Sequence, residues 1–349
     1  MPRDNLSIVL AERPTGDIIP GQTFHQKVTP APTAADLKDG EILVEALYLS
    51  LDPAMRSWLN DVRSYVPPVA IGEVMRGASA CRVLASKSEK AKVGDYVYSD
   101  LGWTEYAILR DGKFTTADAY PGLQDPKDIL SALGMTGLTA WYGMTQIGDP
   151  KPGELVVVSG AAGATGSVAA QIAKLKGARV VGICGSDDKA KWLVDELGLD
   201  AALNYKDADY ARKFTEATKG FIDVYFDNVG GETLELALKQ AKEHARFVMC
   251  GMISQYNTDK PIGPRNIGRV ITMRIKMQGF IIFDHAKMFV QARRELSGWI
   301  KEGKLKKTEH VLTGGLKVAE QGLVDLYKGI NSGKLLVEIK NTNEAPSKL

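Results

Sequence analysis

Residues 155–166 read Leu155-Val-Val-Val-Ser159 and then Gly160-Ala-Ala-Gly-Ala-Thr-Gly166, and this stretch decides the fold class. The first five residues form a continuous apolar run, which is typical of a strand buried on both faces of a parallel sheet. Small residues follow, and the segment from Ser167 to Lys176 then carries apolar side chains at helical spacing. A buried strand, a glycine-rich turn and a helix in this order predict the start of a dinucleotide-binding domain.

The turn departs at one place from the G-x-G-x-x-G pattern of dinucleotide-binding proteins. Ala161 stands where the first glycine is expected, and glycines hold the other two places. Small residues let the backbone approach a pyrophosphate, and the helix N-terminus offers N–H groups and partial positive charge. The alternative is a turn whose glycines serve packing alone. We expect cofactor contacts from Gly160, Ala161, Gly163, Ala164, Thr165 and Gly166.

Strand-like and helix-like segments alternate on both sides of this turn, between residues 134 and 304. Such alternation predicts a doubly wound parallel sheet, the Rossmann type of α/β domain. The expected strands after the turn are Ala178–Ile183, Ala201–Asn204, Val224–Asp227, Arg246–Met249 and Met277–Phe283. The expected helices lie around Trp192, over Tyr210–Thr218 and Thr233–Ala241, and up to about Lys301.

The segment before residue 134 has a different sequence pattern. Short apolar runs at Glu41–Leu47, Ala80–Ala85 and Asp95–Ser99 are separated by glycine-containing turns, which is typical of an antiparallel, barrel-like β domain. The run Leu335–Ile339 is expected to return to it, because the count of Rossmann strands is already complete. We therefore predict one domain from residues 1–133 and 305–349 and a second from residues 134–304.

The composition limits the classes of function. The 349 residues are 44% hydrophobic and include 44 basic and 42 acidic residues, for a net charge of +2. No basic cluster suggests a nucleic-acid or membrane surface, and no run approaches the roughly 20 apolar residues of a membrane span. The first ten residues do not read as a secretory signal, and the three cysteines are widely spaced. We expect a cytoplasmic protein without disulfides.

The end of the second Rossmann strand distinguishes the two nicotinamide cofactors. An NAD enzyme usually places an acidic residue there for the ribose 2′-hydroxyl. This chain has Cys184, Gly185 and Ser186 instead, followed by Lys189 one turn into the next helix. Asp187 and Asp188 oppose this interpretation, but at a helix start they are expected to cap it. A missing anion and a nearby cation favour the 2′-phosphate of NADP(H).

Two segments, Val224-Tyr-Phe-Asp-Asn-Val-Gly-Gly-Glu232 and Ala201-Ala-Leu-Asn-Tyr-Lys206, resemble a known family. It is the zinc-independent prostaglandin reductase, leukotriene B4 12-hydroxydehydrogenase and alkenal double-bond reductase branch of the medium-chain dehydrogenases/reductases. Further similar segments are Leu49–Arg56, Ala70–Gly77, Cys250–Asn257 and Gly329–Lys334, so the resemblance spans nearly the whole chain. It implies a GroES-like β-barrel domain interrupted by a Rossmann domain, an active site between them, and NADPH as hydride donor.

The resemblance also implies roles for single residues. Tyr256 matches an active-site tyrosine that also contacts the cofactor, and Tyr65 matches a substrate-pocket position. The other implied cofactor contacts are Lys189 and Tyr205 at the 2′-phosphate, Asn228 and Asn331 as polar contacts, Cys250 and Gly251 beside the nicotinamide ribose, and Phe280 and Ile282 at the nicotinamide amide.

Zinc ligands are not expected. Zinc-dependent members carry a cysteine three residues before an aspartate in the early loop, and here Leu49 stands three residues before Asp52. A structural zinc lobe needs four clustered cysteines, whereas this chain has three scattered ones. His25, His244, His285 and His310 show no ligand spacing. We therefore predict no metal.

Without a metal, the cofactor must carry the chemistry. The expected reaction is hydride transfer to the β-carbon of an α,β-unsaturated ketone or aldehyde, with Tyr256 or the cofactor ribose bonding the carbonyl oxygen. Alternatives are quinone reduction, oxidation of a secondary alcohol, or a dinucleotide-binding structural or regulatory protein without turnover. The apolar segment 270–283 is expected to form an exposed sheet edge and to pair with its twin in a homodimer.

Overall fold

The apolar run at residue 155 forms β8 (Leu155–Val158), and all four of its residues are buried. It lies inside a six-stranded sheet in which all neighbours are parallel. The other strands are β9 (Arg179–Cys184), β10 (Ala201–Asn204), β11 (Ile222–Asp227), β12 (Ala241–Met249) and β13 (Lys276–Gly279). Their order is β10-β9-β8-β11-β12-β13, the Rossmann order, which reverses between β8 and β11. The predicted α/β fold class is confirmed.

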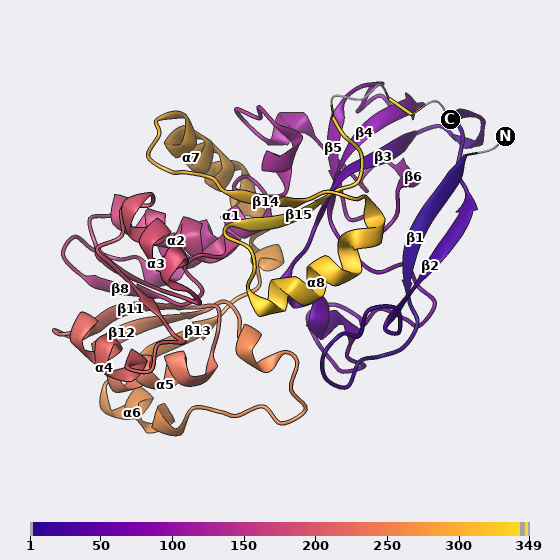
Figure 1. The fold of residues 1–349 in the computed structure, drawn as a ribbon. Helices are drawn as coiled ribbons and strands as arrows, with labels where there is room; N and C mark the ends of the chain where they lie inside the picture. The colour runs from indigo at the N-terminus through magenta and orange to yellow at the C-terminus, as the bar shows by residue number, and fades with distance from the viewer. Residues whose placement is uncertain (1–2, 343–345, 348–349) are drawn as a thin grey trace. The chain divides into compact units, whose positions relative to one another are not determined.

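Helices cover both faces of this sheet, as strands buried on two sides require. They are α1 (Met135–Tyr142), α2 (Ala164–Leu175), α3 (Asp187–Asp195), α4 (Tyr210–Ala217), α5 (Gly231–Lys239), α6 (Arg269–Thr272) and α7 (Phe289–Lys301). Figure 1 shows α1, α2 and α3 on one face of the sheet and α4, α5 and α6 on the other. The site at the end of β8 is therefore formed between two helical layers.

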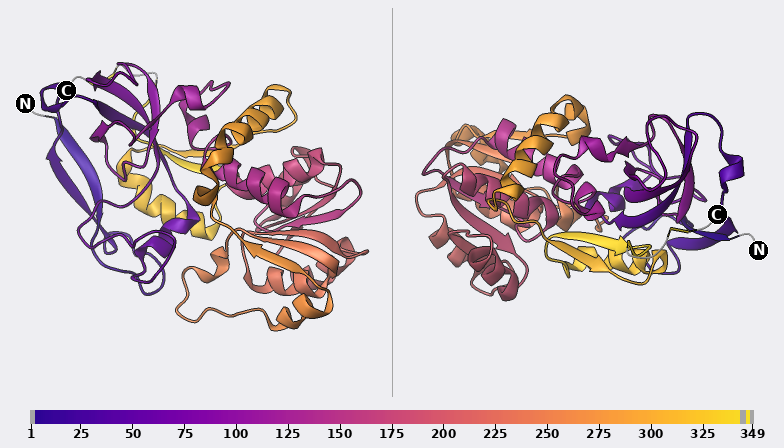
Figure 2. Two further views of the ribbon diagram at one scale, coloured as in Figure 1. Left: turned by 180° about the vertical axis from the view of Figure 1, so that it is seen from behind. Right: turned by 90° about the horizontal axis from the view of Figure 1, so that it is seen from above.

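The predicted strand Met277–Phe283 is wrong over its second half. β13 ends at Gly279, which pairs with Met249, the last residue of β12. Phe280 consequently has no further ladder partner, and a 3₁₀ helix begins at Ile282. β13 stands at the edge of the sheet, where the left view of Figure 2 shows it in orange.

The β-rich part of the chain forms a barrel-like set of antiparallel strands around β3 (Glu41–Ser50), nine of whose ten residues are buried. Two bulges interrupt the pairing of β3 with its neighbour and bend the sheet. The other strands are β1 (Asp4–Leu10), β2 (Phe24–Pro30), β4 (Ser79–Ser86), β5 (Tyr96–Ser99), β6 (Tyr106–Arg110), β7 (Thr115–Thr116), β14 (Glu309–Leu312) and β15 (Lys334–Glu338), with helix α8 (Ala319–Lys328). β14 and β15 are parallel to each other.

The computed structural model describes residues 3–342 and 346–347, and these group into two units. One unit runs to Ser131, resumes over Glu309–Ile330 and continues from Lys334; the other holds Ala132–Thr308 and Asn331–Gly333. The predicted segment 305–349 is thus divided, since 305–308 and 331–333 group with the Rossmann unit. Within the described ranges no helix has the length and apolar character to cross a membrane.

Candidate dinucleotide site

The glycine turn after β8 has the geometry that its sequence predicts. Gly160 adopts φ +59°, and a Cβ at residue 166 would lie 2.2 Å from the Gly160 carbonyl oxygen, so only glycine fits there. Gly163 is the N-cap of α2 and its N–H donates to the Gly160 oxygen at 3.0 Å. Ala164 and Thr165 open the helix. The turn can bring backbone N–H groups to an anion at a helix N-terminus.

Ala161 replaces the first glycine of the pattern without opening the turn. It is fully buried, and its N–H donates to the Ile183 carbonyl of β9 at 2.9 Å. Its methyl group packs against Gly182. A Cβ at residue 182 would lie 3.0 Å from the Ala161 Cβ, so glycine leaves room for the methyl group. Gly182 was not predicted, and it supplies the space that the pattern usually obtains at residue 161.

Asp227 joins the turn to the ends of the neighbouring strands, and the sequence did not single it out. Its Oδ1 atom accepts from the Ser159 hydroxyl at 2.8 Å and from the N–H groups of Val229 and Gly230 at 3.0 and 2.9 Å. Burial raises the pKa of the carboxyl, and these donors oppose the shift. Asn228 donates from Nδ2 to the Ser159 carbonyl at 2.7 Å, so Asn228 lies at the start of the glycine turn.

The loop after β12 is held by the same aspartate. The N–H groups of Cys250 and Gly251 both donate to the Asp227 carbonyl oxygen at 2.9 Å. Burial, followed by the negative charge of Asp227, raises the pKa of the Cys250 thiol to about 12, so the thiol is neutral. Tyr256 accepts from the Met252 N–H at 3.1 Å, and a Cβ at residue 251 would lie 3.1 Å from the Tyr256 oxygen. The structure therefore brings Tyr256 close to Gly251.

The end of β9 gathers the residues expected at a 2′-phosphate. Ser186 caps α3 by accepting from the Lys189 N–H at 3.3 Å. The Tyr205 ring, 47% exposed, packs beside Gly185, where a Cβ would lie 3.2 Å from it. Burial lowers the pKa of the half-buried Lys189 ammonium. Lys206, which the sequence analysis did not select, lies with Nζ 5.8 Å from the centre of the Tyr205 ring and adds positive charge.

Asn331 reaches the glycine turn although about half the chain separates them. The Gly333 N–H donates to the Ala162 carbonyl at 2.8 Å, and Asn331 donates from Nδ2 to the Gly333 carbonyl at 2.7 Å. The Lys189 ammonium donates to the Asn331 carbonyl at 2.7 Å. Gly333 has φ +73° and lies against the backbone of Thr308. A Cβ at residue 333 would be 2.1 Å from the Thr308 carbonyl oxygen. The segment 331–333 thus joins the turn to the Lys189 cluster.

The remaining three predicted site residues belong to other segments of the chain. Phe280 and Ile282 follow β13 instead of lying within it, and the Phe280 ring lies 5.4 Å from that of Tyr142. Tyr65 belongs to the β-rich unit and is 42% exposed. Its oxygen accepts from the Trp58 indole N–H at 2.7 Å.

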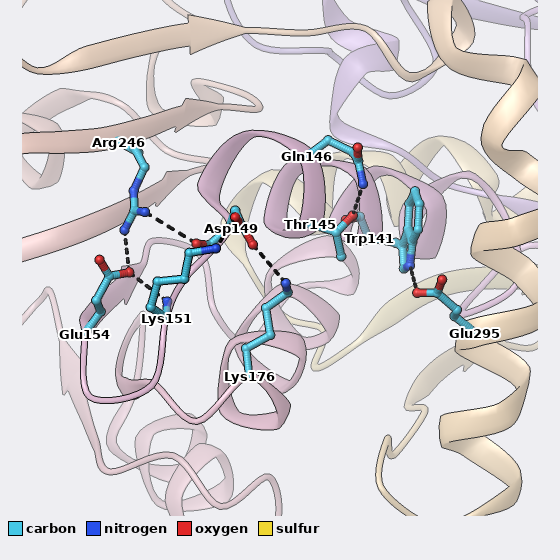
Figure 3. Close-up of polar contacts among 9 residues, drawn as sticks. All are labelled: Trp141, Thr145, Gln146, Asp149, Lys151, Glu154, Lys176, Arg246 and Glu295. Carbon is cyan, nitrogen blue, oxygen red and sulfur yellow. Dashed lines mark hydrogen bonds and ion pairs between the residues drawn. The ribbon is translucent and has the colours of Figure 1, made fainter.

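A second polar cluster lies at the start of β8, away from the turn (Figure 3). Arg246 pairs with Glu154, and Asp149 binds Lys151 and, at 3.1 Å, Lys176. Glu154 directly precedes β8, and Arg246 lies within β12. These charges pair with one another on the amino-terminal side of β8, whereas ligands of α/β sheets bind at the carboxyl ends of the strands. We interpret the cluster as structural.

No group of three or more His, Cys, Asp or Glu side chains that would suit a metal ion occurs among residues 3–342 and 346–347.

This fold and turn define a dinucleotide-binding oxidoreductase of two units. Residues 7–117 match the family described as the N-terminal domain of oxidoreductase, and residues 164–298 match the family described as zinc-binding dehydrogenase. The NADPH-dependent curcumin reductase of Escherichia coli is 38% identical over 95% of this chain and 96% of its own. Prostaglandin reductase 1 of Bos taurus is 40% identical over 86% of this chain and 90% of its own.

A solved structure gives the same result. CurA from Vibrio vulnificus in complex with NADPH superimposes with a TM-score of 0.89 at 38% identity, covering 96% of this chain and 99% of that one. The chain therefore belongs to the zinc-independent, NADP-dependent oxidoreductases of the medium-chain dehydrogenase/reductase superfamily. The predicted family and cofactor class are confirmed.

Proposed function

We propose that this protein reduces the C=C bond of α,β-unsaturated ketones and aldehydes with NADPH. The observation that carries the proposal is the loop at the carboxyl end of β12. The N–H groups of Cys250 and Gly251 donate there to the Asp227 carbonyl, and the Tyr256 hydroxyl lies beside Gly251. Relatives named for curcumin, prostaglandin and 2-alkenal reduction support it.

The cofactor is held by three groups of residues in this proposal. The turn Gly160–Gly166 and the α2 N-terminus bind the pyrophosphate. Lys189, Ser186 and Tyr205 bind the 2′-phosphate, whose negative charge would offset the cost of burying the ammonium. Asn228, Asn331, Phe280 and Ile282 contact the remainder of the cofactor, and the loop Cys250–Gly251 lies beside the nicotinamide ribose.

NADPH, when bound, supplies the hydride that reaches the β-carbon. The chain's own contribution is to orient the substrate, to bind the carbonyl oxygen as negative charge develops on it, and to direct a proton from Tyr256 or water to the α-carbon, which completes the reduction. Tyr256 donates a hydrogen bond from its hydroxyl to the carbonyl oxygen, where negative charge develops, and such a donor contributes roughly 2–4 kcal/mol. The tyrosine oxygen already accepts from the Met252 N–H at 3.1 Å, which orients the hydroxyl.

The reaction is tested by following NADPH consumption with matched substrates. We expect turnover with an enone and a 2-alkenal, none with the saturated ketone of the same chain length, and a product saturated at the C=C bond by NMR. Turnover confined to quinones or secondary alcohols, or NADPH binding without any turnover, would contradict the proposal.

The protein forms a homodimer through the β13 edge of the Rossmann sheet. β13 pairs with β12 alone among the described strands, and exposed apolar side chains stand near it, Ile271 at 80% and Phe283 at 49% exposure. An unpaired edge with apolar neighbours favours pairing with a second copy.

Sedimentation velocity at micromolar concentration should give a mass near twice 37.9 kDa. Ile271→Glu should shift the distribution toward the monomer, because it places a charge in the apolar contact. Val290→Glu, a matched apolar-to-charged change at an exposed position of α7, should not. A monomeric wild-type protein would refute the dimer.

A further inference from the structure

Two lysines converge where β9, the second Rossmann strand, ends. The Lys189 ammonium is half-buried, and the Nζ atom of Lys206 lies 5.8 Å from the centre of the Tyr205 ring. That ring packs beside Gly185, directly after β9. Burial lowers the pKa of the Lys189 ammonium, and the positive charge of Lys206 lowers it further, so the two charges are close enough to repel each other. Two such cations favour the binding of an anion.

Asp187 opposes an anion at this place. It stands about 20 residues after Gly166, where NAD enzymes have the acidic residue that binds the ribose 2′-hydroxyl. A carboxylate there repels a 2′-phosphate and accepts a hydrogen bond from a free 2′-hydroxyl. The start of α3 therefore carries an acid suited to NADH and, two residues later, the Lys189 cation suited to NADPH.

Asn204, the last residue of β10, keeps the acid and the cation apart. Its Nδ2 atom donates to Asp187 Oδ1 at 3.1 Å, so the carboxylate is held at the end of β10. Lys189 donates instead to the Asn331 carbonyl at 2.7 Å, in the segment that lies on the glycine turn after β8. Because β9 lies between β10 and β8, the two charges are directed toward opposite neighbours of β9.

The oxygen of the same amide positions the second cation. Asn204 Oδ1 accepts from the Lys206 N–H at 3.0 Å, which closes an Asx turn directly after β10. This turn places the Lys206 ammonium over the Tyr205 ring. One neutral side chain thus binds the unfavourable carboxylate with its donor and the backbone of the favourable lysine with its acceptor.

We propose that Asn204 is a specificity-determining residue for NADPH, which keeps the Asp187 carboxylate away from the 2′-phosphate and holds Lys206 near it. Asn204 acts through these two charged residues, so it is a positioning residue. The inference rests on the part of the proposed function that assigns the 2′-phosphate to Lys189, and not on the reaction. All of these residues belong to the Rossmann unit.

The test measures the Kd values of NADPH and NADH by isothermal titration calorimetry in the absence of substrate. The readout is the ratio of the Kd for NADH to the Kd for NADPH. Asn204→Ser is uncharged and keeps an acceptor for the Lys206 N–H, but its side chain is too short to hold Asp187. We expect the ratio to fall about three- to tenfold, because the released carboxylate repels the 2′-phosphate and accepts from the 2′-hydroxyl of NADH.

Removal of the Asp187 charge tests how Asn204 acts. In an Asp187→Asn background, Asn204→Ser should leave the ratio unchanged, because no carboxylate remains to be released. Asp195→Asn removes a carboxylate about 12 Å further along α3 and should not suppress the effect of Asn204→Ser. Asn266→Ser, at an asparagine whose Nδ2 donates to the Glu235 carbonyl, should leave the ratio unchanged. An equal fall of the ratio with and without the Asp187 charge would overturn the proposal.

Ionic strength separates this electrostatic role from a structural one. At about 1 M salt the Debye length is about 3 Å, so Asn204→Ser should change the ratio much less than at about 0.1 M. A fall of the same size at both salt concentrations, or equal rises in the two Kd values, would show a loss of local structure and contradict the proposal.

The same titrations distinguish this inference from the proposed reaction. If the wild type binds NADPH no more tightly than NADH, the assignment of the 2′-phosphate fails and the role of Asn204 fails with it. A wild type that prefers NADPH, loses this preference in Asn204→Ser and reduces no enone would support the role of Asn204 and contradict the proposed reaction.

Discussion

Replacing Lys189 with alanine should raise the KM for NADPH about 10- to 100-fold and the KM for NADH far less. A hydrogen bond to a charged group contributes about 1.5–3 kcal/mol, and each 1.4 kcal/mol is a factor of ten. Only NADPH carries the 2′-phosphate that the Lys189 ammonium would bind. The ammonium is half-buried, and burial lowers its pKa, so a phosphate beside it would restore a favourable environment for its charge.

One contact of Lys189 requires a control. Its ammonium donates to the Asn331 carbonyl, so the variant also loosens the segment 331–333 that lies on the glycine turn. That loss would affect both cofactors, and the difference between the two KM changes therefore reports the phosphate contact alone. Lys191→Ala on the same helix removes a lysine whose side chain is 77% exposed and paired with Asp195, and it should affect neither cofactor. Equal rises in the KM for NADPH and the KM for NADH in Lys189→Ala would contradict the assignment of Lys189 to the 2′-phosphate.

The parts of the fold that local sequence patterns describe were predictable. β8, the glycine turn and α2 are contiguous, and their burial and spacing appear in the neighbouring residues 155–175. The strand Ala201–Asn204 has the predicted bounds because turns delimit it on both sides. By contrast, the apolar residues after Gly279 read as strand, and only the end of β12 at Met249 shows why the ladder stops.

The parts of the site that distant segments build could not be derived from local patterns. Asp227 was visible as the residue before Asn228. Three of the four hydrogen bonds to its Oδ1 atom come from Tyr225, Val229 and Gly230 nearby in sequence, but the fourth comes from Ser159, which only the pairing of β11 with β8 brings close. Gly182, in the neighbouring strand β9, leaves the space that the Ala161 methyl group occupies. The family resemblance implied a cofactor contact for Asn331, and the hydrogen bond from the Gly333 N–H to Ala162 shows how this segment is held at the glycine turn.

Replacing Tyr256 with phenylalanine should lower the turnover number for an enone by about tenfold, less than the roughly 10²–10⁴-fold that a positioned proton donor contributes when it acts alone. The hydroxyl lies near Gly251, at the carboxyl end of β12, where α/β sheets bind their ligands. Its oxygen is held by the Met252 N–H at 3.1 Å, so it is positioned before substrate arrives. The ribose hydroxyl and water can share its role, which is why a larger loss is not expected.

The kinetic pattern in Tyr256→Phe distinguishes chemistry from packing. The ring remains, but the Met252 N–H loses its acceptor, and any loosening of the loop would appear as a raised KM for NADPH. Loss of a transition-state interaction instead lowers kcat and kcat/KM together while cofactor affinity stays close to that of the wild type. Tyr96→Phe, in β5 of the other unit, controls for removing a phenol. If kcat is unchanged and only the KM for the enone rises, Tyr256 is a wall of the pocket, and the proton must come from the ribose or from water.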